Sequence, residues 1–309
     1  MLLLIEPSGA DATENIYGAG LLHGALASGI GARRVAVADA SDAASVLRAA
    51  SEAQLLIDAR LLAGLDEAAA TAPGLVAMVQ HASALGPRDA ADPQAYAMLS
   101  CMEHVVVPGA AIAQALGARA AILPERIVVL PPGCDPAPRA NGGDAACAVL
   151  WRGPAAADAT LLRDALRRLT DLDWSLTIAT PEPAGEAGAA GAVARIDARD
   201  PTAMQRAWHD ADLLVVASDW CASDRGAREG LRRGVPVVVC AGGDGGAILD
   251  PTCGLGVTPG DVEQLSKALR RMIFDRPLRL AMSQAAWQRG LALPDWGTQA
   301  RALLAALVA

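Results

Sequence analysis

The residues of this chain that could do chemistry follow two apolar runs in the sequence. These runs, 213–216 and 236–239, suit strands covered on both faces of a parallel sheet. A carboxylate, a thiol, a hydroxyl, a guanidinium and a glycine pair follow the runs: Glu229, Cys221, Ser218, Arg225, Gly242 and Gly243. Glycines allow backbone amides to crowd a ligand, and open α/β sheets bind ligands where their strands end. The pattern therefore predicts a ligand site here.

This stretch resembles the C-terminal half of family 4 glycosyltransferases, enzymes of the GT-B fold that move a sugar from a sugar nucleotide to an acceptor. The resemblance lies in Glu229-Gly-Leu-Arg-Arg-Gly-Val-Pro-Val237, in Gly242-Gly243 and in Gly254-Leu-Gly-Val-Thr-Pro-Gly-Asp261. A second match, within residues 103–135, is similar to the end of the N-terminal domain of the same enzymes. The resemblance therefore covers nearly the whole chain.

The resemblance implies a role for each matching residue. Glu229 would take the ribose hydroxyls of the donor, and Gly242 and Gly243 would hold its diphosphate through their amides. The ordinary alternatives are a solvated helix glutamate and a turn. Cys221 is a candidate catalytic residue, because it replaces the carboxylate that the family aims at the donor sugar, although a thiol is a poor hydrogen-bond partner. A small residue under a loop is its ordinary reading.

A diphosphate leaving group also needs positive charge. The family places an Arg-Lys pair after the first strand of its C-terminal domain, where this chain has Ala156-Ala157. Arg152 is close in sequence, and Arg225 and Arg228 lie at the start of the segment that carries Glu229, so these arginines are candidates for substitute cations. The alternative is that they form a solvated face.

The acceptor side is expected in the N-terminal half. Glu14-Asn15 stands where the family has glycines, and His81 is retained after the fourth strand. We predict that His81 contacts the reacting sugar or the acceptor, although a structural histidine fits equally well. Asn15 is predicted on the acceptor side, and Tyr17 either lines the acceptor pocket or packs.

Alternating apolar runs and amphipathic stretches predict helices wrapped around parallel sheets. The breaker-rich segment Pro136–Asp144 is the clearest linker. We therefore expect two Rossmann-like α/β domains that face one another across a cleft, with the acceptor side in residues 1–140 and the donor side in residues 141–309. In the GT-B fold a terminal helix commonly crosses back onto the first domain.

Composition excludes several classes of protein. The 309 residues carry a formal charge of −8 without a basic stripe, which disfavours a nucleic-acid partner. The six cysteines lack metal-ligand spacing and form no obvious disulfide pattern, so we expect no metal and a reducing, cytoplasmic location. No apolar run approaches membrane-spanning length.

The leading hypothesis is a retaining, metal-independent glycosyltransferase that uses a nucleotide sugar as co-substrate and needs no other cofactor. Its acceptor would be a small molecule or a glycan. The alternative is a glycosyltransferase-like protein that has lost catalysis and acts as a binding or assembly subunit with a protein partner, because Cys221, Ala156-Ala157 and Glu14-Asn15 depart from the family at its sites.

Overall fold

The computed structural model describes residues 1–9, 16–50, 53–80, 93–120, 122–142, 146–153, 159–181 and 193–308. The chain divides into two compact units, one formed by residues 1–133 with 294–309 and the other by residues 134–293. The division falls after Gly133, whereas the sequence placed it at residue 140. The C-terminal residues thus belong to the first unit.

The first unit is built on a six-stranded sheet in the order β2-β1-β3-β4-β5-β6. Every strand pairing in it is parallel, as expected where helices connect successive strands. The strands are β1 Leu2–Pro7, β2 Ala32–Val37, β3 Gln54–Asp58, β4 Leu75–Met78, β5 His104–Val107 and β6 Ile127–Val129. The helices are α1 Ile16–Ala27, α2 Ala40–Ala49, η1 Ala59–Gly64, α3 Glu67–Ala70, α4 Pro93–Cys101, α5 Ala110–Ala120, η3 Pro124–Arg126 and the C-terminal α11 Trp296–Val308.

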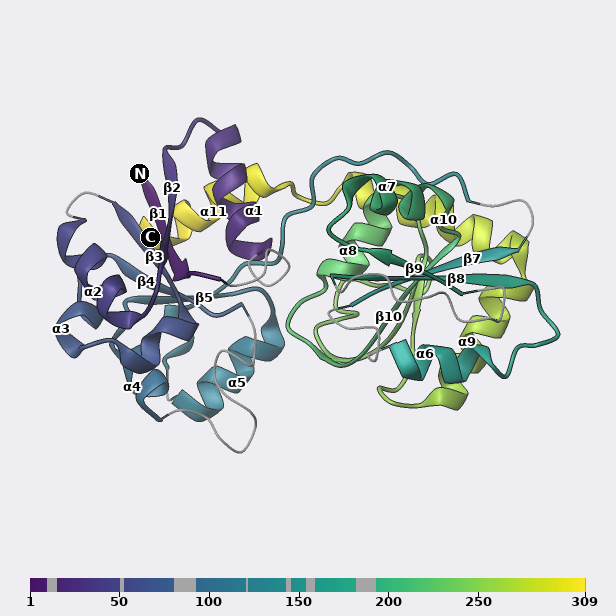
Figure 1. The fold of residues 1–309 in the computed structure, drawn as a ribbon, viewed down its shortest axis with the longest axis horizontal. Helices are drawn as coiled ribbons and strands as arrows, with labels where there is room; N and C mark the ends of the chain where they lie inside the picture. The colour runs from purple at the N-terminus through teal and green to yellow at the C-terminus, as the bar shows by residue number, and fades with distance from the viewer. Residues whose placement is uncertain are drawn as a thin grey trace. The chain divides into compact units, whose positions relative to one another are not determined.

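Helices α1 and α11 lie side by side, although they stand at opposite ends of the sequence (Figure 1). Glycines make the contact close, because a Cβ on Gly20 or Gly24 would collide with Trp296. Trp296 is 8% exposed and shares a core with Leu2 and Leu4 of β1. The last helix is therefore part of the first unit's core.

The second unit is built on a six-stranded sheet in the order β12-β11-β10-β7-β8-β9, again with only parallel pairings between the described strands. The strands are β7 Cys147–Arg152, β8 Trp174–Thr180, β9 Val193–Asp197, β10 Leu213–Cys221, β11 Val237–Gly243 and β12 Gly254–Gly256. The helices are α6 Thr160–Leu166, α7 Pro201–Asp210, α8 Arg225–Arg232, α9 Val262–Phe274 and α10 Arg276–Leu291.

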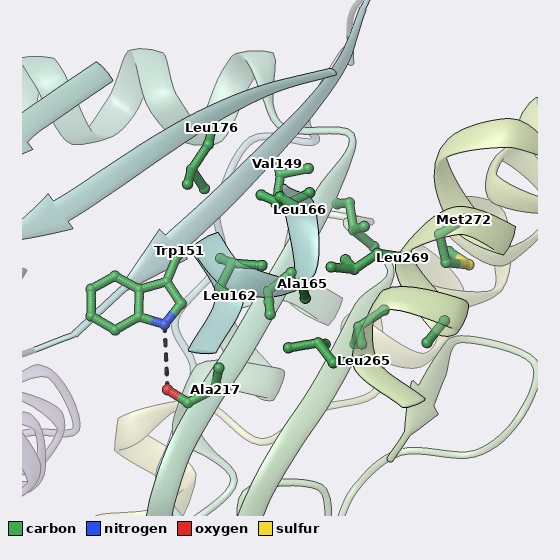
Figure 2. Packing of buried hydrophobic residues seen from close by; sticks show 14 of the residues in the cluster. Val149, Trp151, Leu162, Ala165, Leu166, Leu176, Ala217, Leu265, Leu269 and Met272 are labelled. Atoms are coloured by element: carbon green, nitrogen blue, oxygen red, sulfur yellow. Dashed lines mark hydrogen bonds between the residues drawn. The ribbon is translucent and has the colours of Figure 1, made fainter. Parts of the chain in front are cut away.

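Trp151 is the largest fully buried side chain of the second unit's core. Figure 2 shows its indole among aliphatic side chains, with Nε1 donating to the backbone oxygen of Ala217 at 3.4 Å. This bond joins the carboxyl end of β7 to the neighbouring β10. It fixes the two strand ends beside each other and so prepares the place where the next residues, Arg152 and Ser218, emerge.

The strand order reverses direction in the second sheet at β7. From β7 the chain proceeds outward to β8 and β9, and then returns to β10 on the other side of β7. Open parallel sheets bind ligands at the carboxyl ends of the strands at such a reversal. In the second unit this position lies at the ends of β7 and β10.

Candidate functional site

Five of the predicted site residues come from the two strands at this reversal and from the helix that follows. Arg152 is the last residue of β7, and Ser218 and Cys221 belong to the end of β10. Arg225 and Glu229 lie on α8, directly after β10. The fold therefore brings together residues that are up to 77 positions apart in the sequence.

The Glu229 carboxylate accepts a hydrogen bond from a different arginine on each oxygen. Arg152 Nη1 donates to Oε2 at 2.9 Å, and Arg225 Nη1 donates to Oε1 at 2.9 Å. The three side chains are 23%, 29% and 21% exposed for Arg152, Arg225 and Glu229. They form a half-buried charge cluster that solvent still reaches.

Positive charge predominates in this cluster. Arg233 adds a third guanidinium, whose Nη1 donates to the backbone oxygen of Glu229 at 3.1 Å and which lies over the Trp208 ring at 4.5 Å. Burial raises the pKa of Glu229, but the charges of Arg225, Arg152 and Arg233 outweigh it and hold this pKa below its ordinary value. One ionised carboxylate thus faces three guanidinium groups.

The other arginines of α8 hold the helix in place. Arg228 Nε donates to Asp224 at 2.6 Å, and both side chains are buried. Arg232 donates to backbone oxygens of Cys134 and Gly290, each at 2.7 Å. The Arg228–Asp224 pair is local to the start of α8, whereas the Arg232 bonds anchor the helix on two segments of the second unit and leave Arg225 and Glu229 toward the strand ends.

Cys221 and Ser218 lie where β10 is irregular. The pairing of β10 with β11 shifts between Ser218 and Trp220, and Ser218 Oγ donates to the Trp220 oxygen at 3.1 Å. Burial raises the pKa of the Cys221 thiol, more than a hydrogen bond from Ser218 lowers it. Cys221 is therefore neutral at pH 7 and supplies no negative charge.

Gly242 and Gly243 end strand β11 and pair with Trp220 and Cys221. They are part of the sheet and not of a free turn, because β10 extends beyond Ser218. Gly243 has φ +68, and a Cβ there would collide with the Cys221 oxygen and approach the Trp220 ring at 2.9 Å. A glycine is required at 243 by this close approach.

In the first unit, the Tyr17 side chain packs in the core. Its side chain is buried, its hydroxyl donates to the Leu130 oxygen at 2.5 Å, and its ring meets Trp296 edge-on with centroids 5.7 Å apart. Tyr17 therefore packs between β6 and α11. His81, Asn15 and the Ala156-Ala157 segment lie outside the described residues.

A buried polar network at the carboxyl end of β3 was not predicted from the sequence. Asp58, 2% exposed, accepts from Gln80 Nε2 at 3.0 Å and from Arg60 Nη2 at 2.9 Å. Gln80 follows β4 and is 5% exposed. The sequence offers one signal for this network, an aspartate at the end of an apolar run. Its partners could not be predicted, because tertiary contacts bring them together.

Two further properties bear on the class of protein. No helix of the described residues combines the length and apolarity needed to cross a membrane. Nor do three or more histidine, cysteine, aspartate or glutamate side chains come together as possible metal ligands anywhere in that part of the chain.

Comparison with solved structures places the whole chain beside glycosyltransferases. HepE from Anabaena, solved with UDP and glucose, is 15% identical with a TM-score of 0.75, and the match covers 100% of both chains. WaaG, a glycosyltransferase of lipopolysaccharide biosynthesis, is 15% identical with a TM-score of 0.73 over 98% of both chains. Sucrose-phosphate synthase from Thermosynechococcus elongatus is 14% identical with a TM-score of 0.73 over 99% of both chains.

These matches define the fold, which is that of the GT-B glycosyltransferases, as the sequence predicted. At such low identity they define nothing finer. A scan of the sequence against models of protein families finds no match, and a search of curated proteins finds none either.

Proposed function

We propose that this protein is a glycosyltransferase that uses a nucleotide-sugar donor. The observation that carries the proposal is the Arg152–Glu229–Arg225 cluster, which lies at the ligand-binding position of the second sheet in a chain of GT-B fold. The HepE structures with UDP and with UDP-glucose support a uridine donor as the first one to test.

Transfer breaks the bond between the anomeric carbon of the donor sugar and the diphosphate oxygen. A new bond forms between that carbon and an acceptor hydroxyl oxygen, the hydroxyl proton is released, and the nucleoside diphosphate departs. The diphosphate gains negative charge as the bond breaks, and preorganised guanidinium groups stabilise such charge. Arg152 and Arg225 are the groups that we assign to this task.

Finer features of the proposal come from the resemblance to family 4. Transfer is proposed to retain the anomeric configuration without a metal, with Gly242, Gly243 and Ser218 beside the donor and Cys221 near its sugar. His81 and Asn15 are proposed to serve the acceptor, a small molecule or a glycan, in the cytoplasm. Tyr17 would act there only indirectly, because its hydroxyl and ring are already engaged.

A second candidate function is a GT-B protein that binds a ligand or a protein partner without catalysis. The neutral Cys221 thiol favours it, because the family uses a carboxylate at this place. A variant that restores a carboxylate at position 221 therefore separates the two candidate functions. A C221E change that raises transfer would indicate a weakened enzyme, whereas a protein that binds UDP but never transfers sugar would indicate the binding subunit.

The proposal predicts that a nucleoside diphosphate raises the melting temperature of the protein. A ligand at a hundredfold its dissociation constant adds about 2.7 kcal/mol to stability, which moves Tm by several degrees. Differential scanning fluorimetry with UDP, GDP and ADP measures this shift, and a coupled assay of UDP release from UDP-glucose measures turnover.

The matched control is E263Q, which removes the exposed carboxylate of the Glu263–Lys267 pair on α9. We expect E229A to lose the Tm shift and E263Q to keep it. Absence of a shift in the wild-type protein with all of the three diphosphates would contradict the proposal.

A further inference from the structure

We propose that Arg152 and Arg225 form a diphosphate clamp and that Glu229 acts as its positioning residue, holding the two guanidinium groups apart on its two oxygens. This inference rests on the proposed function and deepens it. It assigns the role of the missing Arg-Lys pair to residues from the end of β7 and the first turn of α8.

The first support is the number of hydrogen-bond donors that remain. A guanidinium carries five N–H groups in a planar fork that suits phosphate oxygens. Within the described part of the chain, Glu229 is the sole hydrogen-bond partner of both Arg152 and Arg225. Most of their donors are therefore available to an anion.

Arg232 shows what a structural arginine looks like on the same helix. It donates to four backbone oxygens, those of Cys134, Asp135, Gly290 and Leu291, at 2.7 to 3.4 Å, and is 6% exposed. Arg152 and Arg225 instead contact one carboxylate and are 23% and 29% exposed. Their bonding leaves them able to bind a ligand that comes from solvent.

The second support is that both arginines are held on fixed elements. Trp151 is buried and bonded to Ala217, and a Cβ on the following Gly153 would collide with the Trp151 ring. Arg152 is thus framed by two residues that have little freedom. Arg225 is held on α8, which Arg232 anchors through the backbone oxygens of Cys134 and Gly290. A preorganised pair loses little conformational entropy on binding.

The third support is the charge and direction of α8. The Asp224 carboxylate precedes the helix, but its charge is paired with Arg228 at 2.6 Å and its side chain makes no capping hydrogen bond, so first-turn amides lack that partner. The positive end of the helix dipole then adds to the guanidinium charges. Both favour an anion with more than one negative charge.

The geometry also changes the role of Glu229. The family's glutamate at this place takes ribose hydroxyls, whereas here each oxygen uses one of its two acceptor sites on an arginine. A positioning role and a ribose role make different demands on the ligand. Inorganic pyrophosphate has two phosphates and no ribose, so it separates the two roles.

The test is calorimetric titration of UDP, 2′-deoxy-UDP, UMP and inorganic pyrophosphate into full-length wild-type protein and variants. We expect R152A and R225A each to lower the affinity for UDP and for pyrophosphate by at least about tenfold, or about 1.4 kcal/mol. The affinity of these two variants for UMP should fall much less. E229Q should weaken pyrophosphate by a similar factor while the ratio of UDP to 2′-deoxy-UDP affinity stays unchanged.

The matched control is R270A, which breaks the exposed pair of Arg270 with Asp171, located before the amino end of β8. We expect it to leave all four affinities unchanged. The variants R152K and R225K keep the charge but not the fork, so they provide a second pair of measurements if an alanine variant folds poorly. We expect intermediate affinities from them.

Three outcomes separate the hypotheses. Unchanged pyrophosphate affinity in R152A and R225A, with UDP still bound, overturns the clamp and the assignment of these two arginines to the departing diphosphate, whereas the UDP binding itself still supports a nucleotide-sugar donor. Loss of the ribose preference in E229Q without loss of pyrophosphate binding overturns the positioning role. Arginine-dependent pyrophosphate binding with no response to UDP, GDP or ADP supports the clamp and contradicts the proposed function.

Discussion

At the scale of single residues, the sequence singled out side chains that the fold brings together, but it did not predict their mutual contacts. Arg152, Arg225 and Glu229 could each be selected from their places after strands or on a helix. The ion pairs depend on β7 lying next to β10, a neighbour relation between segments more than 60 residues apart that no local pattern encodes. The pairing of Gly242 and Gly243 was missed because β10 continues past its irregularity at Ser218 and extends the sheet to Trp220 and Cys221.

The lowered pKa of Glu229 predicts how stability changes with pH. Its pKa is below the ordinary 4.5 in the folded protein, so the folded state binds fewer protons than the unfolded chain. The stabilisation by this carboxylate is therefore complete above the unfolded pKa and is lost as pH falls through the folded value. We expect urea denaturation to show wild type more stable than E229Q at pH 7 and this gap to shrink below about pH 4.

The control for this prediction is E263Q, whose parent carboxylate pairs with Lys267 in full contact with solvent. Exposed pairs contribute little because solvent screens them. The stability difference between wild type and E229Q could stay constant to the lowest pH, or equal the difference for E263Q. Either result would show that the three arginines do not lower the pKa of Glu229 in solution.

At the scale of elements, periodicity predicted most helices and strands. The apolar pattern of the sequence predicts helices near 16–27 and 262–274 and a strand at 104–107, and these ranges match α1, α9 and β5. Strands β9 and β12 were missed. Val193–Asp197 is an edge strand that is mostly half-exposed, so it lacks an apolar run, and Gly254–Gly256 is a three-residue strand with two glycines. Such strands owe their form to a neighbour and not to propensity.

The contact of α1 with α11 predicts the effect of a single methyl group. A Cβ on Gly24 would collide with the Trp296 backbone oxygen, and backbone cannot rotate away as a side chain can. We expect G24A to destabilise the protein by about 1–3 kcal/mol, the usual cost of overpacking. Thermal and urea denaturation measure the loss.

The matched control is G117A on α5, where a Cβ meets nothing within 4 Å. Alanine is the better helix former there, so this variant should be as stable as wild type or more stable by about 0.5–1 kcal/mol. Equal effects of the two substitutions would mean that α11 does not pack on Gly24.

At the scale of the whole molecule, each unit has a core of its own. The first includes Trp296 and Tyr17. The second includes Trp151 in one cluster and Trp208 in another. Helix α11 is the one element whose core membership could not follow from sequence position, because it comes last in the chain but completes the first core. The resemblance to GT-B enzymes predicted that crossing, whereas hydrophobic periodicity alone predicted only a helix.

Separate cores predict that damage to one unit stays local. W296A removes a side chain that is 8% exposed from the first core, at a cost of about 3–5 kcal/mol, and W208A removes one that is 7% exposed from the second. Hydrogen exchange followed by mass spectrometry should show W296A lowering protection in β1 to β6 and α1, including segments nearly 300 residues from the substitution. W208A should lower protection in β7 to β12 instead. If W296A lowered the protection of both sheets equally, the two units would unfold as one cooperative structure. Substitutions in the second unit would then also destabilise the first.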